Sequence, residues 1–230
     1  MLRNCLLFIL LAVNSALVAQ NAGISYGLQV APGFSFRKSL PLNGTNIDEL
    51  IELDELEKGK FAYSAGARVE LNLGKKVGFQ TGVNFVQLGY ATGRQRFIRQ
   101  IEGTEVITER ESQFDFRNVE VPFILNFYQE LSPQGRMYFK MGGSAIYSLS
   151  RREQTREYTE DVLTSDNTTS LTAGADANIS VQTGMGYEHT LGNIAVFVEP
   201  NFQYYLRSQH EDFKFARQPY FLGVTIGAKL

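Results

Sequence analysis

The chain has 230 residues and a formal net charge of −2, and its length is enough for one sizeable domain or a single barrel. The near-neutral charge lacks the basic excess that indicates nucleic-acid binding, so no nucleic acid is expected as a partner. Glycine (21), phenylalanine (17) and tyrosine (11) are abundant and proline (6) is scarce, which is typical of strands and turns and excludes a disordered chain.

The first predicted element is a secretory signal. Arg3 supplies a positive charge, an apolar run follows from Leu6 to Val13, and small residues then predict cleavage after Ala19, with Ala16 as the alternative. The run is too short to cross a bilayer as a helix. We therefore expect a signal peptide at residues 1–19 and a mature, exported domain at residues 20–230.

Alternation with a period of two dominates the mature sequence. From Phe61 to Leu73, the odd positions are apolar, whereas the even positions are small or polar. Because successive side chains of a strand point to opposite faces, such a segment has one apolar and one polar face. Eight segments follow this pattern, at residues 24–30, 61–73, 77–85, 119–127, 139–147, 179–187, 194–204 and 220–230.

The composition of the two faces predicts the surroundings of these strands. The polar parity is rich in Gly, Ser, Asn and Gln, which suits a crowded, hydrated lumen, and an apolar face of about 9–11 residues suits lipid. Short connections (74–76, 129–136 and 189–193) alternate with long ones (37–60, 91–117, 151–178 and 207–217). We predict an all-β, eight-stranded antiparallel transmembrane β-barrel in the outer membrane, with short periplasmic turns and long extracellular loops; a soluble barrel or sandwich is the alternative.

Aromatic residues gather toward both ends of the predicted strands, which predicts two girdles at the membrane interfaces. The turn end carries Tyr26, Phe79, Phe127, Phe139 and Tyr187, and the loop end carries Phe34, Phe61, Tyr63, Phe85, Tyr147, Phe202, Tyr204 and Tyr220. Pro122 and Pro200 fall within strands. Because proline cannot donate to a ladder and a closed barrel has no edge, we expect local bulges at both.

One strand carries a family resemblance. The segment 118–127, NVEVPFILNF, resembles the "leucine-glutamate-isoleucine-proline" strand of the small outer-membrane β-barrel family that includes the PorT-like proteins. The likeness extends over most of the mature chain, through GLQVAPGFSF, YFKMGGSAIYSL, VQTGMGYEH and YFLGVTIGAKL. It implies an outer-membrane barrel, and PorT itself is linked to a protein-secretion system. The chain departs from the pattern in ending at Leu230, where such barrels often end in an aromatic residue.

No catalytic or metal-binding constellation is evident, so we expect no catalytic residue, cofactor or metal. The one cysteine, Cys5, lies in the predicted signal. His189 and His210 fall in a predicted turn and a predicted loop near opposite ends of the barrel, so they are poorly placed for a shared metal site or a catalytic triad.

The inward parity predicts a set of charged residues of both signs inside the barrel. One hypothesis is an ion path or a proteolytic site; the favoured one is an ion-pair network that fills the narrow lumen. The residues are Arg68, Glu70, Glu120, Lys140, Glu188, Glu199 and Lys229.

Two predicted loops carry further patterns. Acidic residues from Asp48 to Glu57 alternate with apolar ones, which predicts a short amphipathic helix that docks or stays solvated, with calcium binding as the weaker alternative. Residues 91–117 are predicted to extend two strands beyond the bilayer as a hairpin. Its candidate binding residues, for lipopolysaccharide phosphates or a protein, are Arg94, Arg96, Phe97, Arg99 and Arg110, with an ordinary solvated rim as the alternative.

The leading functional hypothesis is therefore a non-enzymatic outer-membrane barrel that acts through its extracellular loops or within an envelope or secretion assembly. Its expected partners are outer-membrane lipid, including lipopolysaccharide, and envelope or secretion-system proteins. The alternatives are a narrow channel or membrane-embedded enzyme that uses the interior charges, and a soluble periplasmic ligand-binding barrel.

Overall fold

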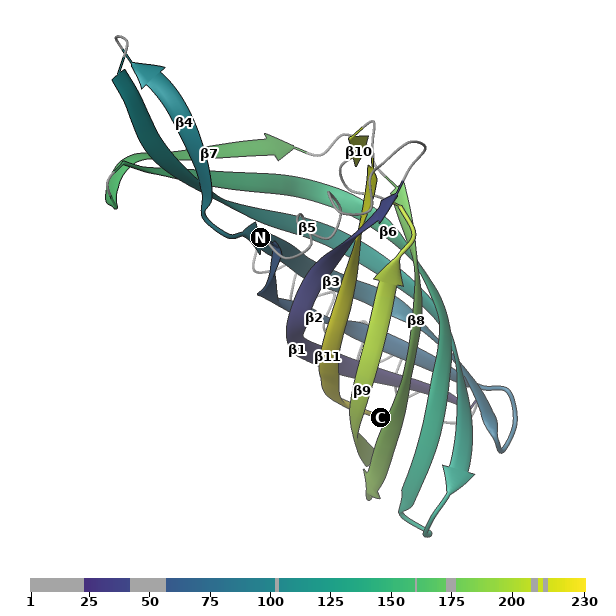
Figure 1. Cartoon of the computed structure of the whole chain (residues 1–230). Helices are drawn as coiled ribbons and strands as arrows, with labels where there is room; N and C mark the ends of the chain where they lie inside the picture. The colour runs from purple at the N-terminus through teal and green to yellow at the C-terminus, as the bar shows by residue number, and fades with distance from the viewer. Residues whose placement is uncertain are drawn as a thin grey trace, which may run out of the picture.

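The structure, a computed structural model, describes residues 23–41, 57–101, 104–159, 161–172, 177–207, 211–212 and 215–230. Within these residues, eight antiparallel strands form a ring in which β11 pairs back with β1 (Figure 1). The ring contains β1 (Ile24–Pro41), β2 (Glu57–Asn72), β3 (Val77–Thr92), β5 (Thr104–Glu130), β6 (Gly135–Thr159), β8 (Ala177–Leu191), β9 (Ile194–Tyr205) and β11 (Phe215–Lys229). The predicted eight-stranded antiparallel barrel is confirmed. The described strands outside the ring are β4 (Gln95–Ile101), β7 (Val162–Thr172) and β10 (Glu211–Asp212).

The ends of the barrel differ as the connection lengths predict. Tight turns at 73–76, 131–134 and 192–193 lie at the end where β1 begins and β11 finishes. Gly192 has a φ of 63°, a left-handed conformation that glycine adopts without strain. This is the end that we predict to face the periplasm.

The two faces of the wall also follow the alternation. Leu28 and Phe61 point outward and are 72% and 58% exposed, whereas their neighbours Gln29 and Ala62 point inward and are 8% and 0% exposed. Every strand of the ring exposes large apolar side chains on its outer face in this way. Exposing so large an apolar surface to water is energetically unfavourable, so the outer face is suited to contact with lipid.

Aromatic side chains form a belt on the outer face toward the loop end. The ring centroids of Phe34 and Phe61 are 6.2 Å apart, and Tyr63 lies 6.4 Å from Phe61 and 6.4 Å from Phe85. The turn end exposes a second group, Phe127, Phe139 and Tyr187. This arrangement agrees with the predicted pair of girdles.

The two strand prolines do not form bulges, so that prediction is wrong. Pro122 pairs in register with Ser144 of β6, and Pro200 pairs in register with Val224 of β11. The ladders on their other sides, β3–β5 and β8–β9, are interrupted near the proline and resume in the same register. Each proline removes only one donor, so the strand loses bonds on one side and keeps its register.

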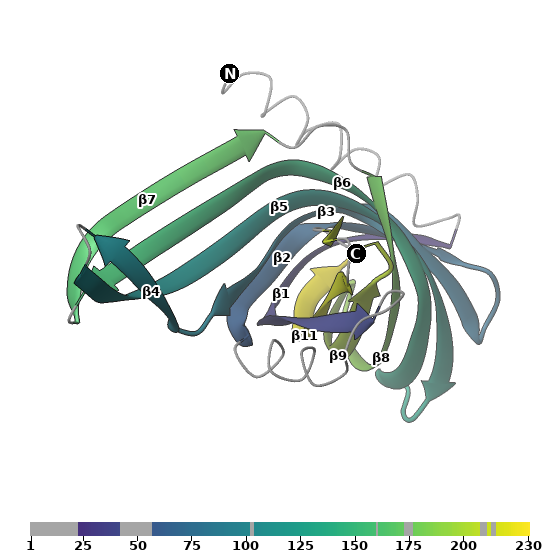
Figure 2. The ribbon, with the colours of Figure 1, turned by 45° about the horizontal axis from the view of Figure 1, so that its top comes forward.

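The longest strands continue far beyond the ring. β5 and β6 remain paired from the turn next to Glu130 as far as Thr108 and Thr159, with one register shift at Arg117/Asn118. β4 flanks the outer part of β5, and β7 flanks the outer part of β6. The outer parts of β5 and β6, with β4 and β7 on either side, form a single-layer sheet that extends away from the barrel (Figure 2). We call this the projecting sheet, residues 94–116 and 150–172.

The projecting sheet bears out one loop prediction and corrects another. The hairpin predicted for residues 91–117 is present as β4 and the outer part of β5. The loop predicted for residues 151–178 is wrong over most of its length, because β6 runs to Thr159 and β7 covers Val162–Thr172. β7 is rich in Thr, Ser and Asn and lacks the apolar parity that marks a membrane strand.

The predicted signal peptide, His210 and nearly all of the predicted acidic helix lie outside the described residues; Glu57, at the end of that acidic run, opens β2. No helix in the described part of the chain is long and apolar enough to cross a membrane.

Candidate functional site

A first group of buried charges is centred on Glu199 of β9. Lys140 Nζ, from β6, donates to Glu199 Oε2 at 2.7 Å, and Arg68 of β2 forms an ion pair with Glu199 Oε1. The hydroxyl of Tyr138 also donates to this carboxylate. All four side chains are at most 3% exposed. Strands from different parts of the sequence are thus connected across the lumen.

A second group lies nearer the turn end, around Glu70. Lys229 Nζ, from β11, is 2.8 Å from Glu70 Oε2 and 2.7 Å from Glu188 Oε2 of β8. Arg136 Nη2, from the start of β6, is 2.8 Å from Glu188 Oε1. Arg68 Nη2 lies 3.1 Å from Glu70 Oε2, which joins this group to the one around Glu199.

The seven residues predicted for the interior all lie in the lumen and are at most 4% exposed: Arg68, Glu70, Glu120, Lys140, Glu188, Glu199 and Lys229. Six of them belong to the two linked groups, which we call the lumen network. The sequence analysis missed Arg136, because it fell in a predicted turn. It also missed Tyr138, which donates to Glu199, and Tyr128, which donates to Glu70. Tyr138 shares the inward parity of Lys140, so the alternation alone could have found it.

Glu120 of β5 stands apart from the lumen network. Its carboxylate accepts hydrogen bonds from Ser144 Oγ at 2.8 Å and from Gln203 Nε2 at 3.0 Å, with Gln182 Nε2 at 3.5 Å. These donors are neutral. The ion pair expected for Glu120 is therefore not formed with any described residue; hydroxyl and amide groups solvate it instead.

A layer of apolar side chains lies on the loop side of Glu120. It is buried and its residues come from β1, β2, β3, β6, β9 and β11: Ala31, Ala62, Val86, Leu88, Ile146, Tyr205 and Phe221. With the lumen network on the other side of Glu120, this layer fills the interior as expected for an eight-stranded barrel, whose width leaves room for little more than side chains.

The predicted binding residues of the projecting sheet lie on two opposite faces. Arg94 and Arg96 share one face, where Arg96 Nε is 2.9 Å and Arg94 Nη1 is 3.5 Å from the carboxylate of Glu109. Arg94 also stacks on the ring of Tyr158, with its guanidinium carbon 4.1 Å from the centroid. The predicted binding residues are therefore divided between the two faces of the sheet.

The opposite face holds Phe97 and Arg110. Arg110 Nη2 lies 2.6 Å from Glu157 Oε1 of β6, and its guanidinium carbon lies 5.3 Å from the Phe97 centroid. The backbone of Arg99 pairs with Val106, and its side chain is not among the parts that the structure describes. Each described arginine of the predicted set thus has a carboxylate partner on its own face.

These pairings affect the carboxylates. The pKa of Glu109 is lowered because Arg96 donates a hydrogen bond to it and Arg94 lies nearby. The pKa of Asp166, on β7, is lowered because Gln154 and Arg156 both donate to it. The ionised forms of both are favoured, which keeps the cross-strand pairs charged at neutral pH.

With this geometry in view, the sequence was compared with known proteins. A family model described as "outer membrane protein beta-barrel domain" matches residues 18–208. The chain belongs to this family. It is an outer-membrane β-barrel protein, and its apolar outer face is accordingly its lipid-facing surface. A comparison with curated proteins found no match.

Several solved structures resemble this outer-membrane barrel at low identity. Neisserial surface protein A is 9% identical, with 89% of this chain and 96% of that chain covered and a TM-score of 0.39. Ail, the attachment invasion locus protein of Yersinia pestis, is 12% identical over 88% and 98%, with a TM-score of 0.33. The outer membrane protease OmpT from Escherichia coli is 9% identical over 90% and 95%, with a TM-score of 0.38. Likenesses at this level carry no argument about function.

The barrel orients the projecting sheet. Outer-membrane barrels place short turns in the periplasm and long connections outside, so the projecting sheet is extracellular. Its two hairpin ends expose apolar side chains: Ile98 (69%) pairs with Ile107 (58%), and Val162 (64%) adjoins Leu163 (50%). We call these four residues the sheet tips. They lie beyond the aromatic belt, on the projecting sheet.

The chemistry available in the barrel is limited. Among the described residues, no group of three or more His, Cys, Asp and Glu side chains is placed to hold a metal ion. His189 lies near the turn 192–193, and its ring stacks on Tyr187, an exposed residue of the outer face. The charges of the lumen network are paired with one another, and Glu120 is held by neutral donors.

Proposed function

We propose that this outer-membrane barrel is non-enzymatic and presents the projecting sheet to a protein partner outside the cell. The observation that carries the proposal is the apolar character of the sheet tips. Four large aliphatic side chains, each at least half exposed, stand in water at the ends of two neighbouring hairpins. Exposed apolar groups of this kind mark protein-binding sites, because burying them against a partner is favourable.

The ion pairs of the projecting sheet favour a protein over phosphate as its ligand. Arg94, Arg96 and Arg110 all have carboxylate partners within 3.5 Å. The two segments of the sheet together contain seven arginines and ten acidic residues, so the sheet carries no basic excess. A lipopolysaccharide phosphate would have to displace these carboxylates, whereas an apolar contact at the tips displaces only water.

The lumen supports a structural role for its charges. A channel needs a hydrated path through the barrel and an enzyme needs a reachable reacting group. The six predicted charges of the lumen network are buried and mutually paired, and an apolar layer covers them on the loop side. Removing a partner from a buried pair is strongly destabilising, so such a network holds strands together. We therefore propose the lumen network as a brace for the wall, in place of an ion path or a proteolytic site.

We also propose that the chain belongs to the PorT-like proteins. Within the outer-membrane barrel family, the segment Asn118–Phe127 supports a place among the PorT-like proteins, with an envelope or secretion assembly as the source of the partner. The test is co-purification: a secretion-linked barrel should be recovered with other envelope proteins after mild detergent extraction of the native membrane. Recovery of the barrel alone would count against this assignment.

Site-specific photo-crosslinking tests the role of the projecting sheet. A photoreactive residue at Ile98 or Ile107 of the full chain, in its native envelope, should give a protein adduct of one defined mass. The same residue at lipid-facing Leu28 should give none, since Leu28 contacts acyl chains. Accessible tips that yield no protein adduct would overturn the proposal.

A shortened barrel provides the matched control. Joining Thr92 to Ser112 and Arg151 to Leu171 through Asn-Gly turns removes the outer sheet and preserves the cross-strand neighbours at each junction. The shortened barrel should still show a heat-dependent shift in electrophoretic mobility, as a closed barrel does. It should no longer compete with the full chain for the crosslinked partner. Undiminished competition would place the binding site elsewhere.

A further inference from the structure

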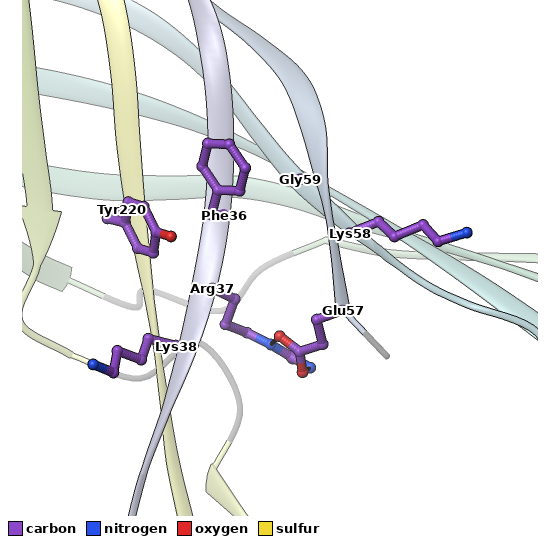
Figure 3. A pocket seen from close by; sticks show the side chains of 7 residues that line it. All are labelled: Phe36, Arg37, Lys38, Glu57, Lys58, Gly59 and Tyr220. Atoms are coloured by element: carbon purple, nitrogen blue, oxygen red, sulfur yellow. Dashed lines mark hydrogen bonds and ion pairs between the residues drawn. The ribbon is translucent and has the colours of Figure 1, made fainter. Parts of the chain in front are cut away.

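The wall of the barrel opens between β1 and β2 at its extracellular rim. The two strands pair from Ile24↔Leu71 up to Ser35↔Lys60 and then separate, although both continue. Beyond this point, β1 stays paired with β11 and β2 stays paired with β3. A cavity of about 210 Å³ occupies the opening, lined by Phe36, Arg37, Lys38, Glu57, Lys58, Gly59 and Tyr220 (Figure 3). We call it the rim gap.

The rim gap is at the level of the outer-leaflet headgroups. Tyr26 belongs to the girdle at the turn end, and Phe36 lies ten residues further along the same strand. At ~3.3 Å per residue and a strand tilt of ~40°, the vertical distance is about 25 Å, the height of the apolar band of such barrels. Side chains just beyond Phe36 therefore meet the polar surface of the membrane.

The walls of the rim gap differ in character. Phe36 and Tyr220 stack on its membrane side, with ring centroids 5.3 Å apart. Toward the lumen, Arg37 and Glu57 form a buried ion pair, with Arg37 Nε donating to Glu57 Oε2 at 2.8 Å, and Arg37 also covers the ring of Tyr90. The ion pair separates the gap from the barrel interior, so a ligand in the gap is reached from the membrane surface.

Each side of the rim gap carries one exposed lysine. Lys38 extends from β1 beside Tyr220, and Lys58 extends from β2 to the opposite side of the Arg37–Glu57 pair (Figure 3). Neither forms an ion pair with an acidic side chain among the described residues. Lys60 differs, because its Nζ lies 2.7 Å from Asp115 Oδ1. Within the described ranges, no acidic side chain competes with an external anion for these two ammonium groups.

We propose that the rim gap is a binding site for a phosphorylated glycolipid of the outer leaflet. Lys38 and Lys58 each reach one phosphate, and they point apart, which suits a headgroup with two phosphates better than a single phosphate held between them. The acyl chains lie along Phe36, Tyr220 and the apolar wall below. This assignment is independent of the role proposed for the projecting sheet. It moves lipid-phosphate recognition away from Arg94, Arg96, Arg99 and Arg110.

Native mass spectrometry of the folded barrel in detergent tests this assignment. The probes are bisphosphorylated lipid A, monophosphorylated lipid A, the dephosphorylated glycolipid and inorganic phosphate. The fraction of barrel that carries a bound lipid should be highest for bisphosphorylated lipid A, lower for monophosphorylated lipid A and lowest for the dephosphorylated glycolipid. Inorganic phosphate alone should not bind measurably, because it lacks the acyl chains. Equal binding of the phosphorylated and dephosphorylated lipids would overturn the proposal.

Charge substitutions locate the site. The double substitution Lys38→Gln/Lys58→Gln should weaken binding of bisphosphorylated lipid A about 5–10-fold, as expected for the loss of two exposed ion pairs. Each single substitution should remove part of this effect. The matched control, Lys75→Gln/Lys76→Gln, changes the net charge equally at exposed positions in the periplasmic turn. Unchanged affinity in the rim variant, or equal losses in both variants, would contradict the assignment.

Discussion

The lumen network and the projecting sheet use the same chemistry in opposite surroundings. In the lumen, the side chains of Arg68 and Glu199 are 1% and 0% exposed, whereas in the projecting sheet those of Arg96 and Glu109 are 79% and 19% exposed. A buried charge that loses its partner keeps its full desolvation cost, but an exposed one regains water. The pairs are therefore essential in the lumen and individually replaceable in the sheet.

The comparison also explains why a single-layer sheet stays folded in water. The projecting sheet has no second layer to bury apolar residues, so its stability must come from continuous backbone ladders and contacts along its two faces. Arginines stack on aromatic rings there, as Arg94 does on Tyr158 and Arg110 on Phe97. Many weak contacts, each about 0.5–1 kcal/mol at exposed sites, replace a core.

The largest effect that would test this contrast is the loss of a lumen carboxylate. Glu199→Leu leaves Arg68 and Lys140 buried without their shared partner, and we expect a loss of about 3–5 kcal/mol in the free energy of unfolding. Denaturant unfolding of the barrel in phospholipid vesicles, followed by the electrophoretic mobility shift, measures this loss. The matched substitution Glu109→Leu in the projecting sheet should leave the unfolding midpoint unchanged within error. Similar shifts for both variants would remove the distinction.

A smaller effect is expected from crowding the lumen. Gly186 lies directly beneath Tyr138, and an added Cβ would overlap the tyrosine ring and disturb its bond to Glu199. We expect Gly186→Ala to cost about 1–3 kcal/mol, as overpacking does. Gly74→Ala, in a turn where an added Cβ meets no atom within 4 Å, should be close to neutral in the same unfolding measurement. Equal stability of the two variants would show that the lumen is loosely packed.

The smallest effect concerns pH and the projecting sheet. Because the pKa of Glu109 and that of Asp166 are lowered in the folded sheet, their contribution is present above the ordinary carboxyl pKa. It is lost as the pH falls through the lowered values, so the sheet should be unaffected between pH 7 and 5 and loosen only in acid.

A carbonyl-detected NMR titration of the barrel in detergent measures these shifts. Arg96→Gln should move the pKa of Glu109 up toward its ordinary value, because Arg96 is the main cause of the lowering. The pKa of Asp166, which depends on Gln154 and Arg156, should stay where it is and serves as the internal control. An unmoved Glu109 would show that the pair does not form in solution.

The barrel itself could be predicted from the sequence because lipid imposes a strict rule. Each membrane strand must keep an unbroken apolar parity, so Leu28, Phe61 and Phe123 mark outer faces without knowledge of any partner strand. β7 could not be predicted in this way. Because both faces of β7 are in contact with water, its sequence need not alternate between apolar and polar residues. The Thr-rich sequence of β7 is therefore also compatible with a loop, and only the pairing with β6 shows that it is a strand.

The candidate sites also contain parts that the alternation of residues reveals and parts that depend on how strands pair. The inward parity picked out residues whose side chains are buried in the lumen, but it could not show the neutral surroundings of Glu120, which depend on Gln203 and Ser144 from other strands. Arg96 and Phe97 are sequence neighbours, so alternation could have separated them onto two faces; the match of Phe97 with Arg110 required the register of β4 and β5. The rim gap depends on where the β1–β2 pairing stops, which no residue pattern reveals.

The continuity of β5 from the barrel into the projecting sheet fixes a distance. From Phe116 to Thr104, the strand spans about 40 Å at ~3.4 Å per residue. A flexible tether of the same number of residues would span only about 20 Å on average and would sample many directions. The sheet instead holds its tips at one fixed distance from the barrel rim, so the proposed partner would have to present its site at that distance.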